Sequence, residues 1–99
     1  MRNVNKVLQE NNSDNVGTVL QDITVGSNVS ILRNKDNQII KSLKCIQRGH
    51  KIALSDIMMG DFVIKYGEVI GVAKEAIRKG DWVHVHNMRS RKSLPVRQR

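Results

Sequence analysis

The chain has 99 residues, a formal net charge of +8 and an apolar content of 39%, which predicts one small domain. Only three residues are aromatic, so the core is expected to consist of Ile, Val, Leu and Met. No apolar run approaches the roughly 20 residues that span a bilayer, and no apolar block follows the first residues. We therefore expect neither a membrane segment nor a signal peptide, and a cytoplasmic location.

Short runs rich in Val and Ile, bounded by Gly, Asp and Asn, predict strands along most of the chain. In chain order they cover residues 16–20, 28–32, 38–43, 51–54, 62–66, 69–73 and 81–86. In the last run, Val83 and Val85 are expected to face one side, and His84 and His86 the other. No segment keeps a helical period over three turns, so the predicted fold class is all-β.

One seven-residue pattern occurs four times, over residues 23–29, 46–52, 57–63 and 77–83. Each copy has an Ile, two variable residues, a Gly, two more variable residues, and then Val or Ile. A glycine between apolar anchors predicts a tight turn in which the glycine takes a positive φ and the tip is exposed.

The positive charge is concentrated at the C-terminal end. Residues 88–99 hold five Lys and Arg and no acid, whereas residues 1–87 hold twelve basic and nine acidic residues. We expect an ordered domain over residues 1–87 and a basic, flexible tail over residues 88–99. Such a tail binds a polyanion, docks on a protein or is solvated, and because few aromatic residues can stack on bases, nucleic acid is the less favoured partner.

Several motifs, in their order along the chain, resemble a known family. They are Asp-Asn-Val at residues 14–16, Gly-His-Lys-Ile-Ala-Leu-x-Asp-Ile at 49–57, Lys-Tyr-Gly-x-x-Ile-Gly at 65–71 and Trp-Val-His-Val-His at 82–86. Over residues 8–88 the chain resembles the SAF, or β-clip, domain that opens altronate and galactarate dehydratases. The resemblance implies a compact β-clip fold and a part in removing water, or sulfite, from an anionic sugar acid or hydroxy acid.

The resemblance also implies a division of labour. In fused members the domain precedes a much larger catalytic domain, and sulfolactate sulfo-lyase resembles the family with a small and a large subunit. We therefore expect this chain to be a small subunit that caps the active site of a large catalytic partner. That partner is expected to hold a divalent metal, often iron in the family, with no cofactor on this chain. The alternative is a stand-alone module that binds a carbohydrate or a protein without catalysis.

The candidate catalytic residues are His50 and Lys51, at the tip of the second glycine turn, and the preceding Gly49 is a candidate for substrate binding. A titratable ring beside a cation suits both proton transfer and the stabilisation of enolate-like charge. The alternative is an exposed turn whose side chains are solvated.

Lys65, Tyr66 and Gly67 form a second candidate segment, at the end of a predicted strand. Lys65 offers a charge and Tyr66 a hydroxyl to an anionic substrate. The alternative is a tyrosine packed by its ring, with Gly67 serving only the geometry of the turn.

Asp14 and Asn15 are the remaining substrate-binding candidates, and the alternative for them is an Asx-type turn before a strand. Family members often have a histidine three residues before this Asp, where this chain has Asn11, which carries no proton and is a poor transition-metal ligand. His84 and His86 share the spacing of a metal-binding pair, but no local third ligand is evident. We therefore expect no metal site on this chain.

Overall fold

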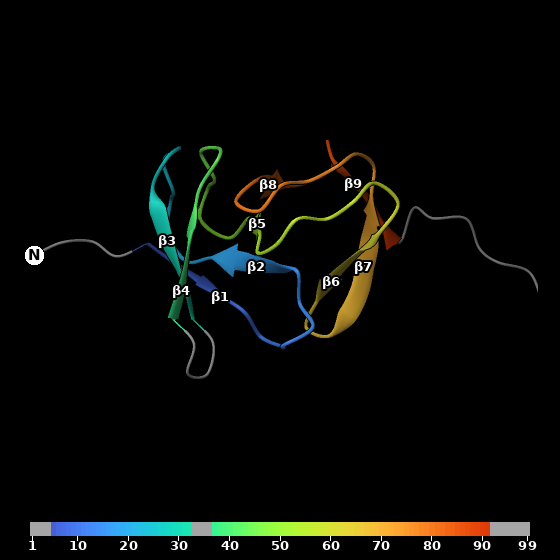
Figure 1. Ribbon diagram of the computed structural model, residues 1–99, viewed down its shortest axis with the longest axis horizontal. Coiled ribbons are helices and arrows are strands. Elements are labelled where there is room, and N and C mark those ends of the chain that lie inside the picture. Colours follow the sequence, from blue (N-terminus) through green and yellow to red (C-terminus); the bar gives the residue numbers. More distant parts are fainter. Residues whose placement is uncertain (1–4, 33–36, 92–99) are drawn as a thin grey trace, which may run out of the picture.

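The computed structural model describes residues 5–32 and 37–91, and every regular element in these ranges is a strand (Figure 1). The strands are β1 (Asn5–Leu8), β2 (Val16–Val19), β3 (Asn28–Leu32), β4 (Asn37–Lys41), β5 (Lys51–Ala53), β6 (Phe62–Lys65), β7 (Glu68–Ala73), β8 (Trp82–Val83) and β9 (Met88–Ser90). The predicted all-β class is therefore confirmed. In the described ranges no helix is long and apolar enough to cross a membrane.

The strands form two sheets. The larger has the order β4-β3-β1-β2-β5-β8 and the smaller the order β6-β7-β9. All pairs are antiparallel except β1 with β3, which run parallel. In Figure 1 the β3–β4 hairpin forms one end of the molecule and the small sheet the other, with β2 and β5 between them.

Two apolar clusters lie on opposite faces of β2, β5 and β8. Val19 and Ile52 belong to the first cluster, whereas Val16, Ala53 and Val83 belong to the second. Successive residues of a strand point to opposite faces, so these three short strands separate the two clusters. Both clusters consist almost wholly of Ile, Val, Leu and Ala, as the lack of aromatic residues predicts.

The four seven-residue copies are four turns of the same kind. Their glycines all have positive φ, with values of 84° at Gly26, 88° at Gly49, 91° at Gly60 and 94° at Gly80. Each turn is closed by a backbone hydrogen bond to the carbonyl three residues earlier, as from His50 to Gln47. The isoleucine that opens each copy is at most 2% exposed. The predicted turns are therefore confirmed.

The turns associate in two reciprocal pairs. Ile23 and Ile46 exchange two backbone hydrogen bonds, and so do Ile57 and Ile77. In every turn the amide of the glycine donates to the carbonyl of the residue four positions before the isoleucine of the partner turn. The amide of that same residue donates back to the carbonyl of the residue that follows the glycine. These bonded residues are Ser42 and Val19 in the first pair, and Ala73 and Ala53 in the second. The domain thus has two halves built alike, each with its own apolar cluster.

The expected strand over residues 81–86 is too long, because β8 ends at Val83. Val83 is buried but Val85 is 63% exposed, so the two valines do not share a buried face. The cause is the buried Asn87, whose Oδ1 accepts from the His84 amide at 2.9 Å and whose Nδ2 donates to the Trp82 carbonyl at 2.9 Å. These bonds close the chain into a turn.

Two strands were not predicted. β1 has a polar sequence, Asn-Lys-Val-Leu, and lies between two strands of the large sheet. β9 lies beyond the expected domain boundary at residue 87, because Met88 is buried in the second cluster and pairs with Ala73 of β7. The remainder of the expected tail, residues 92–99, lies outside the described residues.

Candidate functional site

The three histidines of the chain surround its single tryptophan. The rings of Trp82 and His84 are stacked, 5.4 Å apart between centroids with 12° between their planes. His86 lies 4.8 Å from Trp82 and His50 lies 5.9 Å from it. His50 and His84 are themselves 5.2 Å apart. The sequence did not predict this group, because His50 is 32 residues from Trp82.

The group forms where the two halves meet. His50 follows the glycine of the second turn and Trp82 belongs to the fourth. The turns are joined by β5 and β8, in which Lys51 pairs with Val83 and Ile52 pairs with Trp82. We call His50, Lys51, Lys65, Trp82 and His84 the junction cluster.

Trp82 is held from several sides. Its ring packs against the first apolar cluster and its amide donates to Asp81 Oδ1 at 2.9 Å. Its indole Nε1–H donates to Nδ1 of His50 at 3.3 Å. His50 is fixed in turn by its backbone, which bonds Gln47 and Val19 at 3.0 Å each. The cluster is therefore built on rigid elements, which suits a binding site.

The electrostatics of the junction cluster favour an anion. Burial, and then the charge of Lys65, lower the pKa of Lys51. Burial, followed by the charges of His50, Lys51 and His86, lowers the pKa of His84. The only ion pair among the described residues joins Lys44 to Asp81 at 3.2 Å, so neither Lys51 nor Lys65 is paired with a carboxylate. A bound carboxylate would relieve this repulsion.

The β6–β7 hairpin presents Lys65 and Tyr66. Tyr66 and Gly67 have φ values of 57° and 73°, as in a two-residue type I′ hairpin turn. A positive φ is uncommon for a bulky residue. Tyr66 is 58% exposed, and the Lys65 ammonium lies 4.0 Å above the centre of its ring. The tyrosine is therefore displayed at the tip of the hairpin, with its ring outside the apolar clusters.

Asp14 and Asn15 attach the chain before β2 to this hairpin. Asp14 is buried, and its two carboxylate oxygens accept from the amides of Gly67, at 2.7 Å, and Asn11, at 3.1 Å. The Asn15 side chain accepts from the Ile64 amide at 2.7 Å and donates to the Phe62 carbonyl at 2.9 Å. Both side chains thus bond the backbone of the β6–β7 hairpin, and these bonds support the position of Lys65 and Tyr66.

The candidates therefore occupy two places. His50 and Lys51, with the adjacent Gly49, lie in the second turn at the junction, whereas Asp14, Asn15, Tyr66 and Gly67 belong to the hairpin region. Lys65 connects them, because it is on β6 and its charge acts on Lys51. Sequence reasoning missed Trp82 and Asn87, although the position of a lone tryptophan two residues before a histidine was a signal for the former.

The residues do not suit a metal ion. No group of three or more His, Cys, Asp or Glu side chains within residues 5–32 and 37–91 is placed to hold one. In addition, Lys51 acts on His84 with a positive charge, which opposes a cation there.

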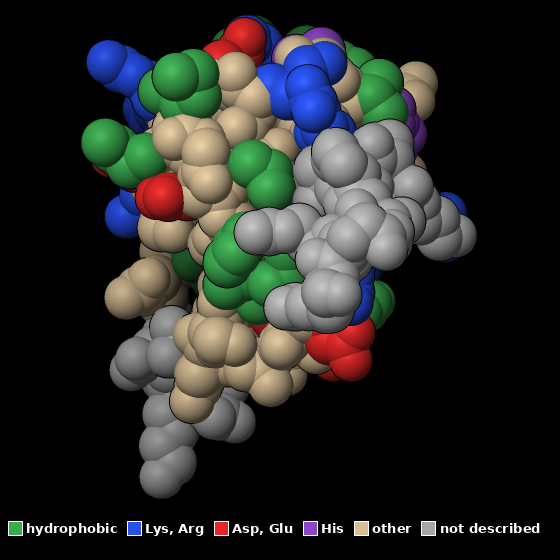
Figure 2. Space-filling model, turned by 90° about the vertical axis from the view of Figure 1, so that its right-hand side faces the viewer, with side chains coloured by type: hydrophobic (Ala, Val, Ile, Leu, Met, Phe, Trp, Pro, Cys, Tyr) green, Lys and Arg blue, Asp and Glu red, His purple; other side chains and the backbone are tan. Residues whose placement is uncertain are grey.

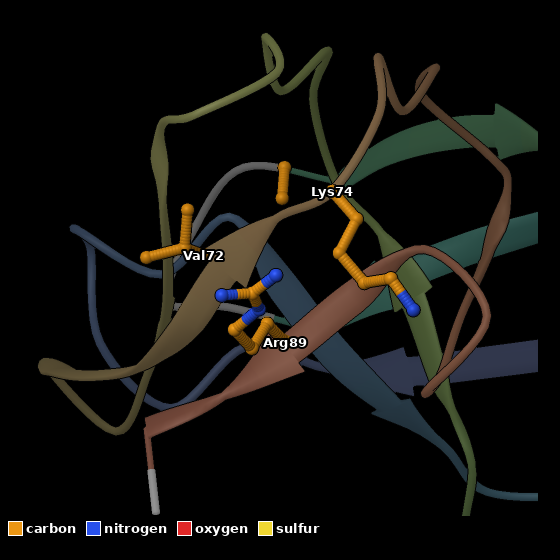
Figure 3. A pocket seen from close by; sticks show the side chains of 4 residues that line it. Val72, Lys74 and Arg89 are labelled. Atoms are coloured by element: carbon orange, nitrogen blue, oxygen red, sulfur yellow. The ribbon is translucent and has the colours of Figure 1, made fainter. Parts of the chain in front are cut away.

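A separate basic pocket lies on the small sheet (Figure 3). Its volume is about 330 Å³, and Val72, Ala73, Lys74 and Arg89 line it. The Lys74 ammonium donates to the Val85 carbonyl at 2.9 Å, and the Arg89 guanidinium extends between Val72 and Lys74 in the view of Figure 3. The face seen in Figure 2 carries hydrophobic, basic and acidic side chains, with histidine visible at its upper edge.

The chain matches known proteins over most of its length. Residues 5–91 match the family model described as the altronate/galactarate dehydratase SAF domain. The chain is 46% identical to altronate dehydratase of Escherichia coli over 77 residues, 78% of this chain and 15% of that enzyme. It is 38% identical to altronate dehydratase of Bacillus subtilis over 81 residues, again 78% of this chain and 15% of the enzyme.

A shorter match extends to a subunit of another lyase. The chain is 43% identical to (2R)-sulfolactate sulfo-lyase subunit alpha of Chromohalobacter salexigens over 44 residues, 44% of this chain and 47% of that subunit. The chain thus spans about 15% of the length of the altronate dehydratases and about half of the sulfo-lyase subunit.

Proposed function

The chain belongs to the family of altronate/galactarate dehydratase SAF domains, and from this we propose that it supplies a carboxylate-binding surface to a lyase of sugar acids or hydroxy acids. The observation that carries the proposal is the junction cluster, where burial and then the charge of Lys65 lower the pKa of Lys51, and where neither lysine has a carboxylate partner among the described residues. A cation pair next to rigid hydrogen-bond donors suits an anionic ligand.

In this proposal each candidate has a distinct role. Lys51 and Lys65 neutralise the carboxylate of the substrate and the enolate-like charge that develops when its α-proton is removed. His50 donates a hydrogen bond to a substrate oxygen, and Tyr66 offers its hydroxyl from the hairpin tip. Asp14, Asn15, Gly49 and Gly67 hold the two segments in place. Lysines beside a developing negative charge lower the barrier without themselves transferring a proton.

We further propose that the rest of the reaction belongs to a large catalytic subunit, whose active site this domain caps. One finding supports this: two of the chain's relatives are named as the alpha subunit of (2R)-sulfolactate sulfo-lyase. A divalent metal, with iron as the first candidate, would then be held by the partner.

The alternative is a stand-alone module that binds a sugar acid without catalysis. It is favoured by one observation: the junction cluster is assembled wholly from residues of this chain. Binding under this alternative needs no second subunit.

The test is to purify the tagged chain from extract of its own cells at moderate salt and identify the bound protein by mass. We expect a stoichiometric large subunit whose complex eliminates water or sulfite from a hydroxy acid, whereas the chain alone does not. The Lys51→Met variant should keep the partner and lose most of the activity. Activity of the chain alone would contradict the division of labour, and binding of a sugar acid without any partner would favour the stand-alone module.

A further inference from the structure

The hydrogen bond between Trp82 and His50 determines which nitrogen of His50 can carry a proton. An indole nitrogen only donates hydrogen bonds, so Nδ1 of His50, at 3.3 Å, must accept with its lone pair. A neutral imidazole whose Nδ1 accepts carries its proton on Nε2. Nε2 makes no hydrogen bond with any residue in the described part of the chain.

We propose that Trp82 is a positioning residue that holds His50 as the neutral Nε2–H tautomer, so that His50 serves as a hydrogen-bond donor to an oxygen of the bound acid. A neutral imidazole used in this way stabilises a developing oxyanion without giving up its proton. The donor role of His50 therefore excludes proton abstraction by this ring in the same complex, because the Nδ1 lone pair is already used.

The geometry around the bond makes the arrangement stable. The tryptophan cannot turn away easily, since its ring packs on the first apolar cluster and stacks on His84 at 5.4 Å. Its carbonyl is held by Asn87 at 2.9 Å. His50 is fixed by the glycine turn that precedes it, in which Gly49 has a φ of 88°. A flipped or doubly protonated His50 ring would leave the indole N–H without its acceptor.

Lys51 is the residue next to His50, and the ring of His84 lies 5.2 Å from that of His50. In the proposed complex the lysines compensate the negative charge of the bound acid, and the Nε2–H of His50 fixes the orientation of the oxygen that it contacts.

The part of this inference that concerns the ligand rests on the proposed function, whereas the tautomer does not. The full chain, labelled with ¹⁵N, is studied by long-range ¹H–¹⁵N correlation at about pH 8, where ordinary imidazoles are neutral. We expect His50 to show a protonated Nε2 and an unprotonated Nδ1. In Trp82→Phe the two nitrogens should shift toward the averaged positions of an unconstrained ring.

The matched control is His86→Gln, which removes another ring in contact with Trp82, at 4.8 Å, but not the bond to His50. It should leave the His50 resonances in place. If Trp82→Phe does not fold, His50→Phe provides the reciprocal measurement, in which the indole proton of Trp82 should move to its position in a free indole. A protonated Nδ1 in the native chain, or an unchanged indole proton in His50→Phe, would overturn the proposal.

Binding of galactarate as a probe separates this inference from the proposed function. We expect Trp82→Phe to weaken galactarate binding about three- to tenfold, the effect of one misdirected hydrogen bond. If His50 has the Nε2–H tautomer but the chain binds no galactarate, the positioning role of Trp82 is supported and the proposed function is wrong. If the chain binds galactarate tightly but His50 has a mixture of tautomers, the proposed function is supported and the positioning role is wrong.

Discussion

The two halves of the domain use the same backbone arrangement with different side chains. Each half has two isoleucines that exchange backbone hydrogen bonds, and an aspartate that accepts from the amide in the partner turn. Asp22 accepts from Arg48 at 2.9 Å in the first half, and Asp56 from Lys79 at 2.8 Å in the second. The glycine is followed by Ser27 or His50 in one half, and by an aspartate in both turns of the other.

The difference shows where this fold carries chemistry. The isoleucines and aspartates that both halves share hold the backbone in place, and their hydrogen-bonding groups are already used in doing so. The junction cluster instead takes His50 from one half and Trp82 from the other, and is present only where β5 and β8 join them. Each half thus contributes a rigid scaffold of the same kind, whereas the proposed binding surface occurs only where the two halves meet.

The largest expected effect tests whether the two halves unfold together. Ile46→Ala and Ile57→Ala each remove a side chain that is at most 2% exposed, one from each cluster. Each should lower the free energy of unfolding by about 2–5 kcal/mol, from lost burial and the cavity left behind. Urea unfolding followed by circular dichroism should show one transition in both variants. Two separate transitions would show that the halves unfold independently.

A smaller effect distinguishes the turns within this shared scaffold. Gly26→Ala should cost about 1–2 kcal/mol, because φ is 84° but no atom lies within 4 Å of an added Cβ. Gly80→Ala should cost clearly more, because φ is 94° and the added Cβ would clash with the Lys41 carbonyl oxygen. Thermal unfolding of the two variants measures the difference. Equal losses would contradict the close approach of the fourth turn to β4.

The junction cluster should respond differently from the scaffold. Lys51→Met keeps the apolar stem and removes the charge, so galactarate binding measured by calorimetry should weaken roughly tenfold, as for a lost charge-assisted contact. Its unfolding midpoint should not fall, because the native state holds Lys51 with a lowered pKa and therefore disfavours its charge. The control, Lys79→Met, removes an exposed cation at the fourth turn and should leave binding unchanged. Equal weakening in both variants would indicate only a general charge effect.

The smallest effect concerns pH. The pKa of His84 is lowered in the folded chain, so the unfolded chain binds its proton more readily as pH falls through about 6.5. Stability contributed by neutral His84 should therefore be present above this pH and be lost below it. Urea midpoints at about pH 8 and about pH 5 should differ less in His84→Gln than in the native chain. An equal difference in both would contradict the assignment to His84.

Much of the scaffold could be predicted from sequence because its signals are local. The Ile-x-x-Gly-x-x-Val pattern identified the four turns, since apolar anchors and a glycine with positive φ are properties of seven consecutive residues. β1 could not be found in this way, because Asn5–Leu8 is polar and is a strand only through its neighbours β2 and β3. The early end of β8 depends likewise on the buried bonds of Asn87.

The site could be predicted only in part. His50, Lys51 and Lys65 are candidates that the family resemblance proposes, whereas the candidates Asp14 and Asn15 bond the backbone of the β6–β7 region. The contact of Trp82 with His50 depends on the pairing of β5 with β8, which is a long-range event that no local pattern encodes.

The most direct test of the proposed carboxylate-binding surface is a titration of the ¹⁵N-labelled chain with galactarate, followed by amide and side-chain shifts. We expect saturable shifts confined to the junction cluster and the β6–β7 hairpin, at His50, Lys51, Lys65, Trp82 and His84. Shifts centred instead on the pocket of Lys74 and Arg89, or no saturable shift at all, would contradict it.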